Sequence, residues 1–444
     1  KGIKMSHVFP RNNLGPAPVA VAGDGCYLID SDGRRFFDGS GGAAISSLGH
    51  SNAKVASAVK DQVARLAFAH TSFFTSEPSE ELAELLVKNA PGDLDRVYFV
   101  SGGSEAIEAA MKLARQYYVE LGQLKRSNFI ARRQSYHGNT LGALAAGGNR
   151  LRREQFFPLL FDVTHIAPCY EYAERSDDES LYDYGQRVAQ ELEDEIVRLG
   201  PDTVIAFIAE PVVGSTMGAV PAVEGYFKRI REICDTYGVL LILDEVMCGM
   251  GRTGHLFACE EDKIVPDIVC MAKGLGAGYQ PIGAMICSSG IYKVIETGSG
   301  FFQHGHSYLG HPVAVAAALA VVQELFSKDL IDRSKLMGEK LQKALLEKLG
   351  QHPHVGDIRG RGLFRGIELV YDRNEKTPFA PELMIASKIK AAAFDAGLLC
   401  YPMSGTRDGK KGDHILLAPP FILLDKHIDE IVSKLSAAID VAIS

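Results

Sequence analysis

An acidic residue and a lysine end two neighbouring apolar runs in the middle of the chain. The run VLLILDE (239–245) contains Asp244, and DIVCMAK (267–273) finishes with Lys273, which glycine-rich turns follow. A lysine amine forms a Schiff base with an aldehyde, and a carboxylate keeps the nitrogen of a pyridine ring protonated so that the ring accepts electrons. Together the pair suits a bound pyridine aldehyde, whereas either residue alone would indicate only a strand-end acid or a surface lysine.

The turn Ser101-Gly102-Gly103-Ser104 follows another apolar run and opens a helical pattern. Backbone N–H groups at a helix start, together with the positive end of the helix dipole, bind anions, and glycine lets the anion approach the backbone. Gly103 and Ser104 are therefore candidate anion ligands. An ordinary helix cap made by Ser104 explains the same pattern, so these residues alone leave both interpretations open.

Two further side chains are placed to hold the faces of a flat ligand. Tyr136 follows the run NFIAR (128–132), and Val246 follows the acidic pair. A tyrosine near a strand end is more often simple packing, so the stacking role is one of two interpretations. Glu210 ends the run VIAFIAE. A carboxylate buried there needs a partner, whether it orients a substrate or pairs with a cationic loop residue.

Three histidines, at positions 304, 306 and 311, cluster in FFQHGHSYLGHP. Histidine is a common metal ligand, but no nearby cysteine or carboxylate completes a ligand set. His311 also precedes a proline at an expected helix start. We therefore expect no metal site.

The elements that must position these residues are short apolar runs that alternate with amphipathic helices. Such apolar runs indicate strands buried on both faces, and hence an α/β fold with a mostly parallel sheet between helices. Ligands collect at the carboxyl ends of the strands in such sheets. Strands are expected at 96–101, 128–132, 204–210, 239–245, 267–273 and 282–288, and helices at 104–121, 181–199 and 223–237.

The two ends of the chain differ from this central region. Near the N-terminus, YLIDSDGRRFFDGSGG has short β-like runs broken by turns. Near the C-terminus, the strands GLFRGIEL and GLLCYP are expected between helices at 312–326, 331–350 and from Asp425 onward. We expect three parts: an N-terminal segment (1–60) that joins a small domain, a large domain (61–325) and a C-terminal small α+β domain (326–444).

Composition argues against several classes of protein. The 444 residues are 46% hydrophobic and 23% charged, with a formal net charge of -8, which is ordinary for a globular protein. No run of about 18 apolar residues predicts a membrane span, and no basic block predicts nucleic-acid binding. The eight cysteines form no CxxC pair, and several lie inside apolar runs. This favours free cysteines in a reducing compartment, the cytoplasm.

Together these motifs resemble the class III pyridoxal-phosphate-dependent aminotransferases of fold type I, the group of the ω-amino acid and amine transaminases. The resemblance extends from GDGCYLIDSDGRRFFDGSGG to GDHILLAPPF, almost the whole chain. It implies a large domain with a mostly parallel, doubly wound sheet, and a smaller α+β domain built from both termini. The matching motifs are SGGSEAIEAAMKLAR, QSYHGNTLGAL, IAEPVVG, LILDEVMCGMGRTG, MAKGLGAGYQPIGA and SYLGHPVAVAAALA.

The resemblance also implies roles for individual residues. Lys273 would hold pyridoxal 5′-phosphate as a Schiff base and shuttle a proton, and Asp244 would pair with the pyridinium nitrogen. Gly103 and Ser104 would bind the phosphate. Ser307 stands where the family usually has a threonine that reaches the phosphate from the neighbouring subunit. A homodimer with shared active sites is therefore implied.

The remaining implied positions concern the ring and the substrate. Tyr136 and Val246 would form the two faces of the ring sandwich, with Glu210 nearby. Many family members have a glutamine at the position of Met247, where it bonds the ring hydroxyl. Many also have a substrate-binding arginine at the position of Tyr401. The nearest substitute is Arg407 in the loop SGTRDG, which is either a clamp for a substrate carboxylate, able to swing to Glu210, or a solvated residue.

The activity implied is transfer of an amino group from an ω-amino acid or amine to a keto acid, pyruvate or 2-oxoglutarate, by a ping-pong mechanism. A decarboxylase of the dialkylglycine type, an amino acid racemase or epimerase, and a phospho-lyase would use the same lysine and aspartate, and the sequence leaves these alternatives open. A nucleotide-binding enzyme is disfavoured because no GxGxxG opens a helix after the first strand and no GxxxxGK[ST] occurs. A catalytically silent scaffold is a further alternative.

Overall fold

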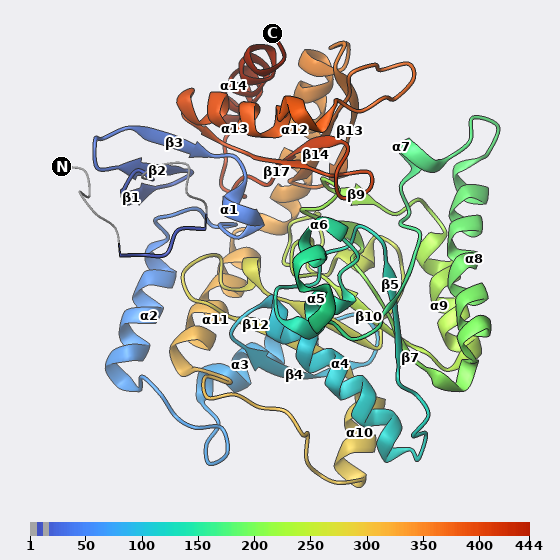
Figure 1. Cartoon of the computed structure of the whole chain (residues 1–444). Coiled ribbons are helices and arrows are strands. Elements are labelled where there is room, and N and C mark those ends of the chain that lie inside the picture. Colours follow the sequence, from blue (N-terminus) through green and yellow to red (C-terminus); the bar gives the residue numbers. More distant parts are fainter. Residues whose placement is uncertain (1–6, 12–16) are drawn as a thin grey trace.

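The computed structural model describes residues 7–11 and 17–444 (Figure 1), so positions 1–6 and 12–16 of the expected segment 1–60 lie outside the described residues. The fold is built on a seven-stranded sheet. Strand β12 runs antiparallel to both of its neighbours, and the other described pairs in this sheet are parallel. The strand order is β4 (Leu94–Val100), β12 (Gly283–Ser288), β11 (Ile268–Met271), β10 (Leu240–Asp244), β7 (Val204–Ala209), β5 (Asn128–Arg132) and β6 (Thr164–Ile166).

Helices cover both faces of this sheet. Successive side chains of a strand point to opposite faces, and along β10 Leu240 and Ile242 pack into one hydrophobic core while Leu241 and Leu243 pack into the other. Helix α4 (Gly103–Glu120) closes the first core. Helices α8 (Leu181–Leu199), α9 (Tyr226–Tyr237) and α11 (Pro312–Ser327) contribute to the second. The expected α/β fold is confirmed.

Both ends of the chain join in a smaller layer beside the central sheet (Figure 1). The N-terminal strands form an antiparallel meander, and β3 then pairs in parallel with β15, so that Phe37 lies opposite Leu398. These four strands are β1 (Ala20–Asp24), β2 (Tyr27–Asp30), β3 (Arg35–Asp38) and β15 (Leu398–Leu399). A further antiparallel sheet contains β13 (Val355–Arg361), β14 (Phe364–Leu369), β17 (Asp413–Leu417) and β16 (Tyr401–Ser404).

Helices pack against this C-terminal part, and short elements connect the rest. The helices of the C-terminal part are α12 (Leu330–Leu349), α13 (Ile385–Asp395) and α14 (Asp425–Ile443). In the described part of the chain, no helix is long and apolar enough to span a bilayer. Further elements are α1 (Gly41–Ala44), α2 (Ala53–Arg65), α3 (Glu77–Lys88), α5 (Leu141–Ala146), α6 (Arg150–Arg153), η1 (Glu154–Leu159), β8 (Val212–Val213), η3 (Ala258–Glu260), η4 (Lys273–Leu275) and α10 (Ser289–Thr297).

The six strands expected in the central region are confirmed with small shifts at their ends. The short edge strand β6 was not expected, because its three residues carry too little apolar pattern to separate it from a loop. The run GLLCYP, expected as one strand, is split between β15 and β16, which belong to different sheets. The domain boundaries at residues 60 and 325 stay a prediction.

Candidate active site

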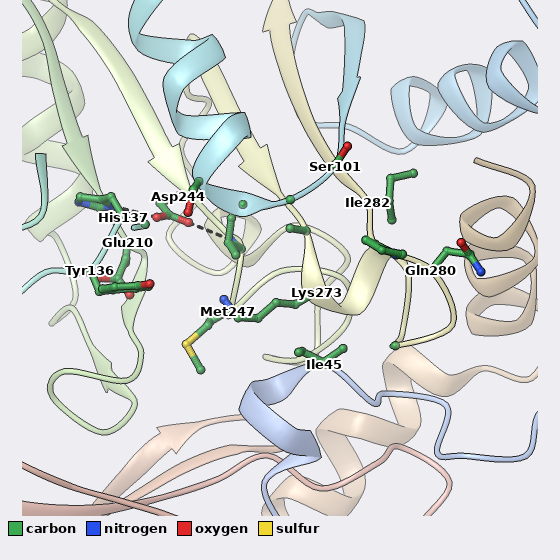
Figure 2. A pocket seen from close by; sticks show the side chains of 18 residues that line it. Ile45, Ser101, Tyr136, His137, Glu210, Asp244, Met247, Lys273, Gln280 and Ile282 are labelled. Carbon is green, nitrogen blue, oxygen red and sulfur yellow. Dashed lines mark hydrogen bonds and ion pairs between the residues drawn. The ribbon is translucent and has the colours of Figure 1, made fainter. Parts of the chain in front are cut away.

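The main pocket lies at the carboxyl ends of the central parallel strands and has a volume of about 400 Å³ (Figure 2). Four of its lining residues are strand-end residues that were singled out from the sequence. Asp244 ends β10, Lys273 follows β11, Glu210 follows β7, and Ser101 follows β4. The fold therefore brings together residues that lie far apart in the sequence.

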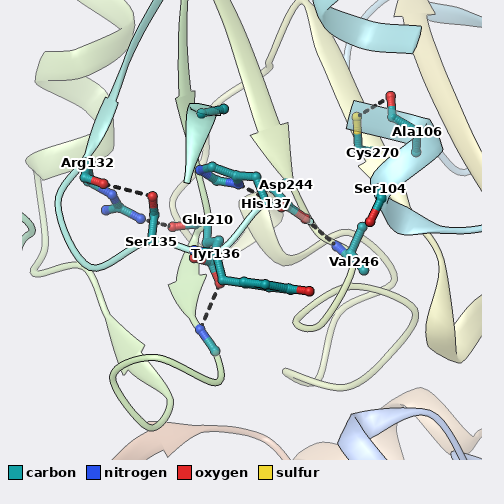
Figure 3. A network of polar contacts seen from close by, with 12 residues as sticks. Ser104, Ala106, Arg132, Ser135, Tyr136, His137, Glu210, Asp244, Val246 and Cys270 are labelled. Atoms are coloured by element: carbon teal, nitrogen blue, oxygen red, sulfur yellow. Dashed lines mark hydrogen bonds and ion pairs between the residues drawn. The ribbon is translucent and has the colours of Figure 1, made fainter. Parts of the chain in front are cut away.

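Asp244 is 4% exposed and has two hydrogen-bond donors (Figure 3). Its Oδ2 is 2.8 Å from Nδ1 of His137, and its Oδ1 accepts a bond from the backbone N–H of Val246 at 3.0 Å. Because a carboxylate only accepts, Nδ1 of His137 is the donor. The neighbouring acid, Glu245, has a different role, because its carboxylate accepts bonds from the backbone N–H groups of Ala258 and Cys259 in η3 at 2.5 and 2.9 Å.

Lys273 extends into the pocket from the first turn after β11, opposite Tyr136 (Figure 2). Its φ of 42° lies in the left-handed region, which is strained for a residue other than glycine and concentrates at functional sites. Burial lowers the pKa of its amine below the ordinary 10.5, and the negative charges of Asp244 and Glu210 offset part of this shift. The amine is therefore easier to deprotonate than that of a surface lysine.

Glu210 fixes the segment that carries Tyr136. Its Oε1 accepts a bond from the backbone N–H of Tyr136 at 3.1 Å, and its Oε2 accepts one from Gly214 at 2.8 Å. Burial raises the pKa of Glu210, and the nearby charge of Asp244 adds to this shift, while His137 opposes it. The guanidinium of Arg132 donates to the backbone carbonyl of Glu210 (Figure 3).

Tyr136 and Val246 both line the pocket, and their expected role as the two ring faces stays a prediction. Val246 lies close to the backbone of Gly103, because a Cβ at Gly103 would be only 2.8 Å from Val246 Cγ1. Glycine is therefore required there. Tyr136 has a cationic neighbour, because the guanidinium of Arg152 in α6 lies 4.5 Å from the centre of its ring.

The start of α4 forms the side of the pocket expected to hold an anion. Its N-cap is Gly102, and no side chain caps the helix. A Cβ at Gly102 would meet no atom within 4 Å, so the backbone there is open to a ligand. Ser104 does not cap the helix, which removes the alternative interpretation. Its hydroxyl donates to Asn139 Oδ1 at 2.8 Å and accepts from the Asn139 N–H at 3.0 Å.

The structure does not bring three of the predicted residues into this pocket. Ser307 is exposed on the loop between α10 and α11. Tyr401 in β16 packs against an apolar cluster that includes Met247. Arg407 has its Nε 3.5 Å from Glu368 Oε1, so its acidic partner in this structure is Glu368 and not Glu210. Their predicted roles stay predictions.

Several residues that line the pocket were not predicted from the sequence. His137 is the most important of them, since its side chain is fully buried and hydrogen-bonds Asp244. The signal available was the position of His137 beside Tyr136, together with the need of a buried strand-end carboxylate for a donor. Gln280, Pro281 and Ile282 also line the pocket; they stand in the motif MAKGLGAGYQPIGA but were given no role. No signal in the sequence marked Ile45, which follows α1.

None of the three clustered histidines lines the pocket: His304 and His306 lie beside α4, and His311 is the N-cap of α11. His304 Nδ1 is 3.2 Å from Lys112 Nζ, and His306 Nε2 is 4.0 Å from Glu105 Oε2. Among the residues that the structure describes, no group of three or more His, Cys, Asp or Glu side chains is arranged to hold a metal ion.

Comparison with known proteins places this pocket in a family. The family model "Aminotransferase class-III" matches residues 9–439. The chain belongs to the class III aminotransferases. An uncharacterized aminotransferase of Schizosaccharomyces pombe is 42% identical to this aminotransferase over 440 residues, covering 99% of this chain and 96% of the relative.

Two further similarities extend the comparison. A chloroplastic gamma aminobutyrate transaminase of Solanum lycopersicum is 35% identical to this class III aminotransferase, with 95% of this chain and 80% of the relative covered. The crystal structure of an (S)-enantioselective omega-transaminase from Thermomicrobium roseum superposes with a TM-score of 0.92 at 35% identity, and covers 99% of this chain and 97% of that one. The fold and the amino-transfer activity of this aminotransferase follow from these matches.

Proposed function

We propose that this class III aminotransferase uses pyridoxal 5′-phosphate in the main pocket to move an amino group from an ω-amino acid or amine to a keto acid, pyruvate or 2-oxoglutarate. The observation that carries the proposal is that Lys273 and Asp244, from neighbouring strands, line one pocket. The names of the tomato relative and of the omega-transaminase structure support a donor whose amino group is not on an ordinary α-carbon.

The residues present fit this cofactor. The pocket offers a slot between Tyr136 and Val246 for a flat ring, an open helix start at Gly102 for a phosphate, a buried carboxylate at Asp244 and an amine at Lys273. These are the groups that a pyridine aldehyde carrying a phosphate requires. When bound, the cofactor supplies an aldehyde that condenses with amines and a ring that accepts the electrons of the broken bond.

The residues would divide the work as follows. Asp244, held by His137 Nδ1 and the Val246 N–H, would keep a proton on the nitrogen of a bound ring. Lys273 Nζ, whose pKa is lowered by burial, would accept the proton from the substrate's reacting carbon and later return it. Gly103 and Ser104 would bind the phosphate, and Glu210 holds the backbone of Tyr136 in place beside the ring slot.

The chain departs from the usual family pattern at Met247 and at Tyr401. Met247 lines the pocket and provides no hydrogen bond to a ring hydroxyl. Arg407 is proposed as the clamp for a substrate carboxylate, which requires it to leave Glu368 and the rings of Tyr170 and Tyr172, each 5.2 Å from its guanidinium. In this proposal Tyr401 lies beside the path of the substrate into the pocket.

We also propose that the chain forms a homodimer with shared active sites, with Ser307 reaching the phosphate of the partner subunit. Exposed aromatic side chains support an interface on this side of the molecule, since Phe73 is 80% and Tyr308 62% exposed. Contiguous exposed apolar surface of this kind marks interaction sites. Phe68 joins the two segments by packing edge-on against Tyr308.

A reducing compartment, the cytoplasm, is the proposed location. All eight cysteines are buried and none is in a disulfide. Buried free cysteines are typical of proteins kept in a reducing environment.

The proposal is tested by the visible spectrum and by half-reactions. Purified protein given the cofactor should turn yellow, and borohydride should fix the cofactor's mass on the peptide that contains Lys273. The change Lys273→Ala should remove the fixed mass and lower turnover by about 10³-fold or more, whereas Lys125→Ala, a surface control, should change neither. Normal turnover of the Lys273→Ala variant would overturn the assignment.

A donor and acceptor panel tests the reaction type. Exchange that requires a keto acid, measured with several amines and with pyruvate or 2-oxoglutarate, supports transamination. Release of CO2, or inversion of an amino acid without an acceptor, would contradict it.

A further inference from the structure

A second cavity lies beside α6, which supplies Arg150 and Arg153 to its lining. Its volume is about 570 Å³. We call it the arginine cavity, because three of its lining residues are arginines. It is lined by Arg133, Gly148, Arg150, Arg153, Glu154, Phe157 and His165.

The charges of the arginine cavity are not balanced. Glu154 is its one carboxylate, and it is 3.9 Å from Arg150 with about half of its side chain exposed, so this ion pair is weak. In the described part of the chain, no carboxylate lies within ion-pair distance of Arg133 or Arg153. Burial lowers the pKa of His165 to about 4, so this ring is neutral at neutral pH. Two positive charges are left without a counter-charge.

Arg153 also has an unmet hydrogen-bonding group. Its Nε is shielded from solvent and has no partner among the described residues. A buried donor without a partner costs about 1–3 kcal/mol. A guanidinium meets this need best with a carboxylate or phosphate, which it binds through two parallel hydrogen bonds. The geometry of the cavity therefore favours an anion.

The surroundings add positive charge. The loop 405–412 packs on α6, because a Cβ at Gly409 would lie 3.2 Å from Arg150 Cβ. That loop carries Lys410 and Lys411, and the carboxylate of Asp408 is occupied by their two backbone N–H groups at 2.8 Å each. In Figure 1, α6 is seen between α5 and the C-terminal strands, which agrees with this contact. A positive region of this size stands out in a chain of net charge -8.

We propose that the arginine cavity is a binding site for a small dianion, a phosphate or a dicarboxylate, separate from the phosphate site at the start of α4. The two sites are distinct, since the cavity shares no lining residue with the main pocket. They are also adjacent, because α6 supplies Arg150 and Arg153 to the cavity and places Arg152 on the ring of Tyr136. The proposal does not depend on the assignment of Lys273 and Asp244.

The experiment is calorimetric titration of the cofactor-loaded enzyme, in which the phosphate site of α4 is filled. Inorganic phosphate and succinate are titrated separately, and the tighter of the two identifies the class of dianion. The change Arg153→Gln should weaken binding about tenfold or more, because it removes a charge-assisted pair of hydrogen bonds. Arg65→Gln is the matched control, because Arg65 is an exposed arginine that pairs with Glu77 on a distant helix.

A second variant guards against misfolding of the first. Glu154→Gln removes the cavity's one carboxylate, so it should strengthen binding of the same dianion, and no loss of structure can imitate a gain of affinity. Equal affinity in the wild type, Arg153→Gln and Glu154→Gln would overturn the proposal, as would the absence of binding at millimolar concentrations. The cofactor absorbance should be the same in all variants, which separates this test from that of the proposed function.

Discussion

Two adjacent carboxylates at the end of β10 show how position decides what a residue does. Asp244 faces the pocket and is held by a histidine, whereas Glu245 bonds two backbone N–H groups of η3 and serves the fold. The sequence singled out Asp244 because of its place at a strand end, and Asp244 does line the pocket. It could not assign a function to His137, whose contact with Asp244 depends on the spacing of β5 and β10 across the sheet.

Replacing His137 tests its role in holding Asp244. The change His137→Leu leaves a buried carboxylate without one of its donors, which should lower the free energy of unfolding by about 1–3 kcal/mol and weaken retention of the cofactor. His137→Asn keeps a donor, so its losses of stability and of cofactor retention should be smaller. Urea unfolding and cofactor absorbance after dialysis measure the two effects. Equal losses in the two variants would show that the hydrogen bond is unimportant.

The lowered pKa of Lys273 predicts a pH-dependent stability. In the unfolded chain this amine keeps its proton up to about pH 10.5, but in the folded protein it releases the proton at lower pH. Between these values the unfolded state binds more protons, so stability rises with pH. Cofactor-free Lys273→Met should therefore be more stable than the wild type at neutral pH, and the difference should shrink as the pH approaches 10.5.

Urea unfolding of the cofactor-free proteins at several pH values checks this expectation. Lys125→Met serves as the control, since the Lys125 side chain is 79% exposed. A stability difference between Lys273→Met and the wild type that stays constant across the pH range would contradict it.

At the scale of elements, the pocket depends on how closely a turn after β5 approaches the start of α4. Gly138 has a φ of 144°, and a Cβ there would lie 2.5 Å from Ser104 Oγ and 2.8 Å from the Cβ of Ala143. The sequence indicated the two elements through their apolar patterns. It did not indicate that they touch, because the contact depends on the packing of the sheet and not on any local pattern.

The change Gly138→Ala should separate this turn from α4. It displaces Ser104, so cofactor affinity should fall about tenfold, in addition to a loss of stability. Gly122→Ala is the control, because it has a comparably unfavourable φ of 74° but no atom within 4 Å of its added Cβ. The dissociation constant of the cofactor, measured by absorbance titration, should change in the first variant and not in the second.

The same limit of local patterns explains Arg407. Its loop is polar and flanked by glycines, which is typical of an exposed segment. Its partner Glu368 is fully buried in β14, among residues that read as an ordinary strand. The pairing depends on the antiparallel contact of β14 with β17, and no local pattern in the sequence predicts that contact.

At the scale of the whole molecule, the exposed aromatic side chains between α2 and α3 and in the loop before α11 are the strongest sign of assembly. A double change, Phe73→Asp with Phe74→Asp, places charge in the proposed interface and should convert the proposed dimer to a monomer. Activity should be lost as well, because the proposal gives each active site residues from both subunits. Leu346→Asp is the control on a distant helix, where Leu346 is 48% exposed. Light scattering after size exclusion measures the mass. A wild-type protein that is monomeric at micromolar concentration would refute the proposed dimer.

The parallel pairing of β3 with β15 has a consequence for how the protein is made. Leu398 lies opposite Phe37, so one edge of β3 stays unpaired until β15 is synthesised about 360 residues later. At roughly 5–20 residues per second, that is about 20–70 seconds of synthesis. During this interval the open edge of β3 is free to join strands of other nascent chains. A chain cut short before residue 398 keeps that edge for its lifetime, and chaperones rather than the fold itself must protect it.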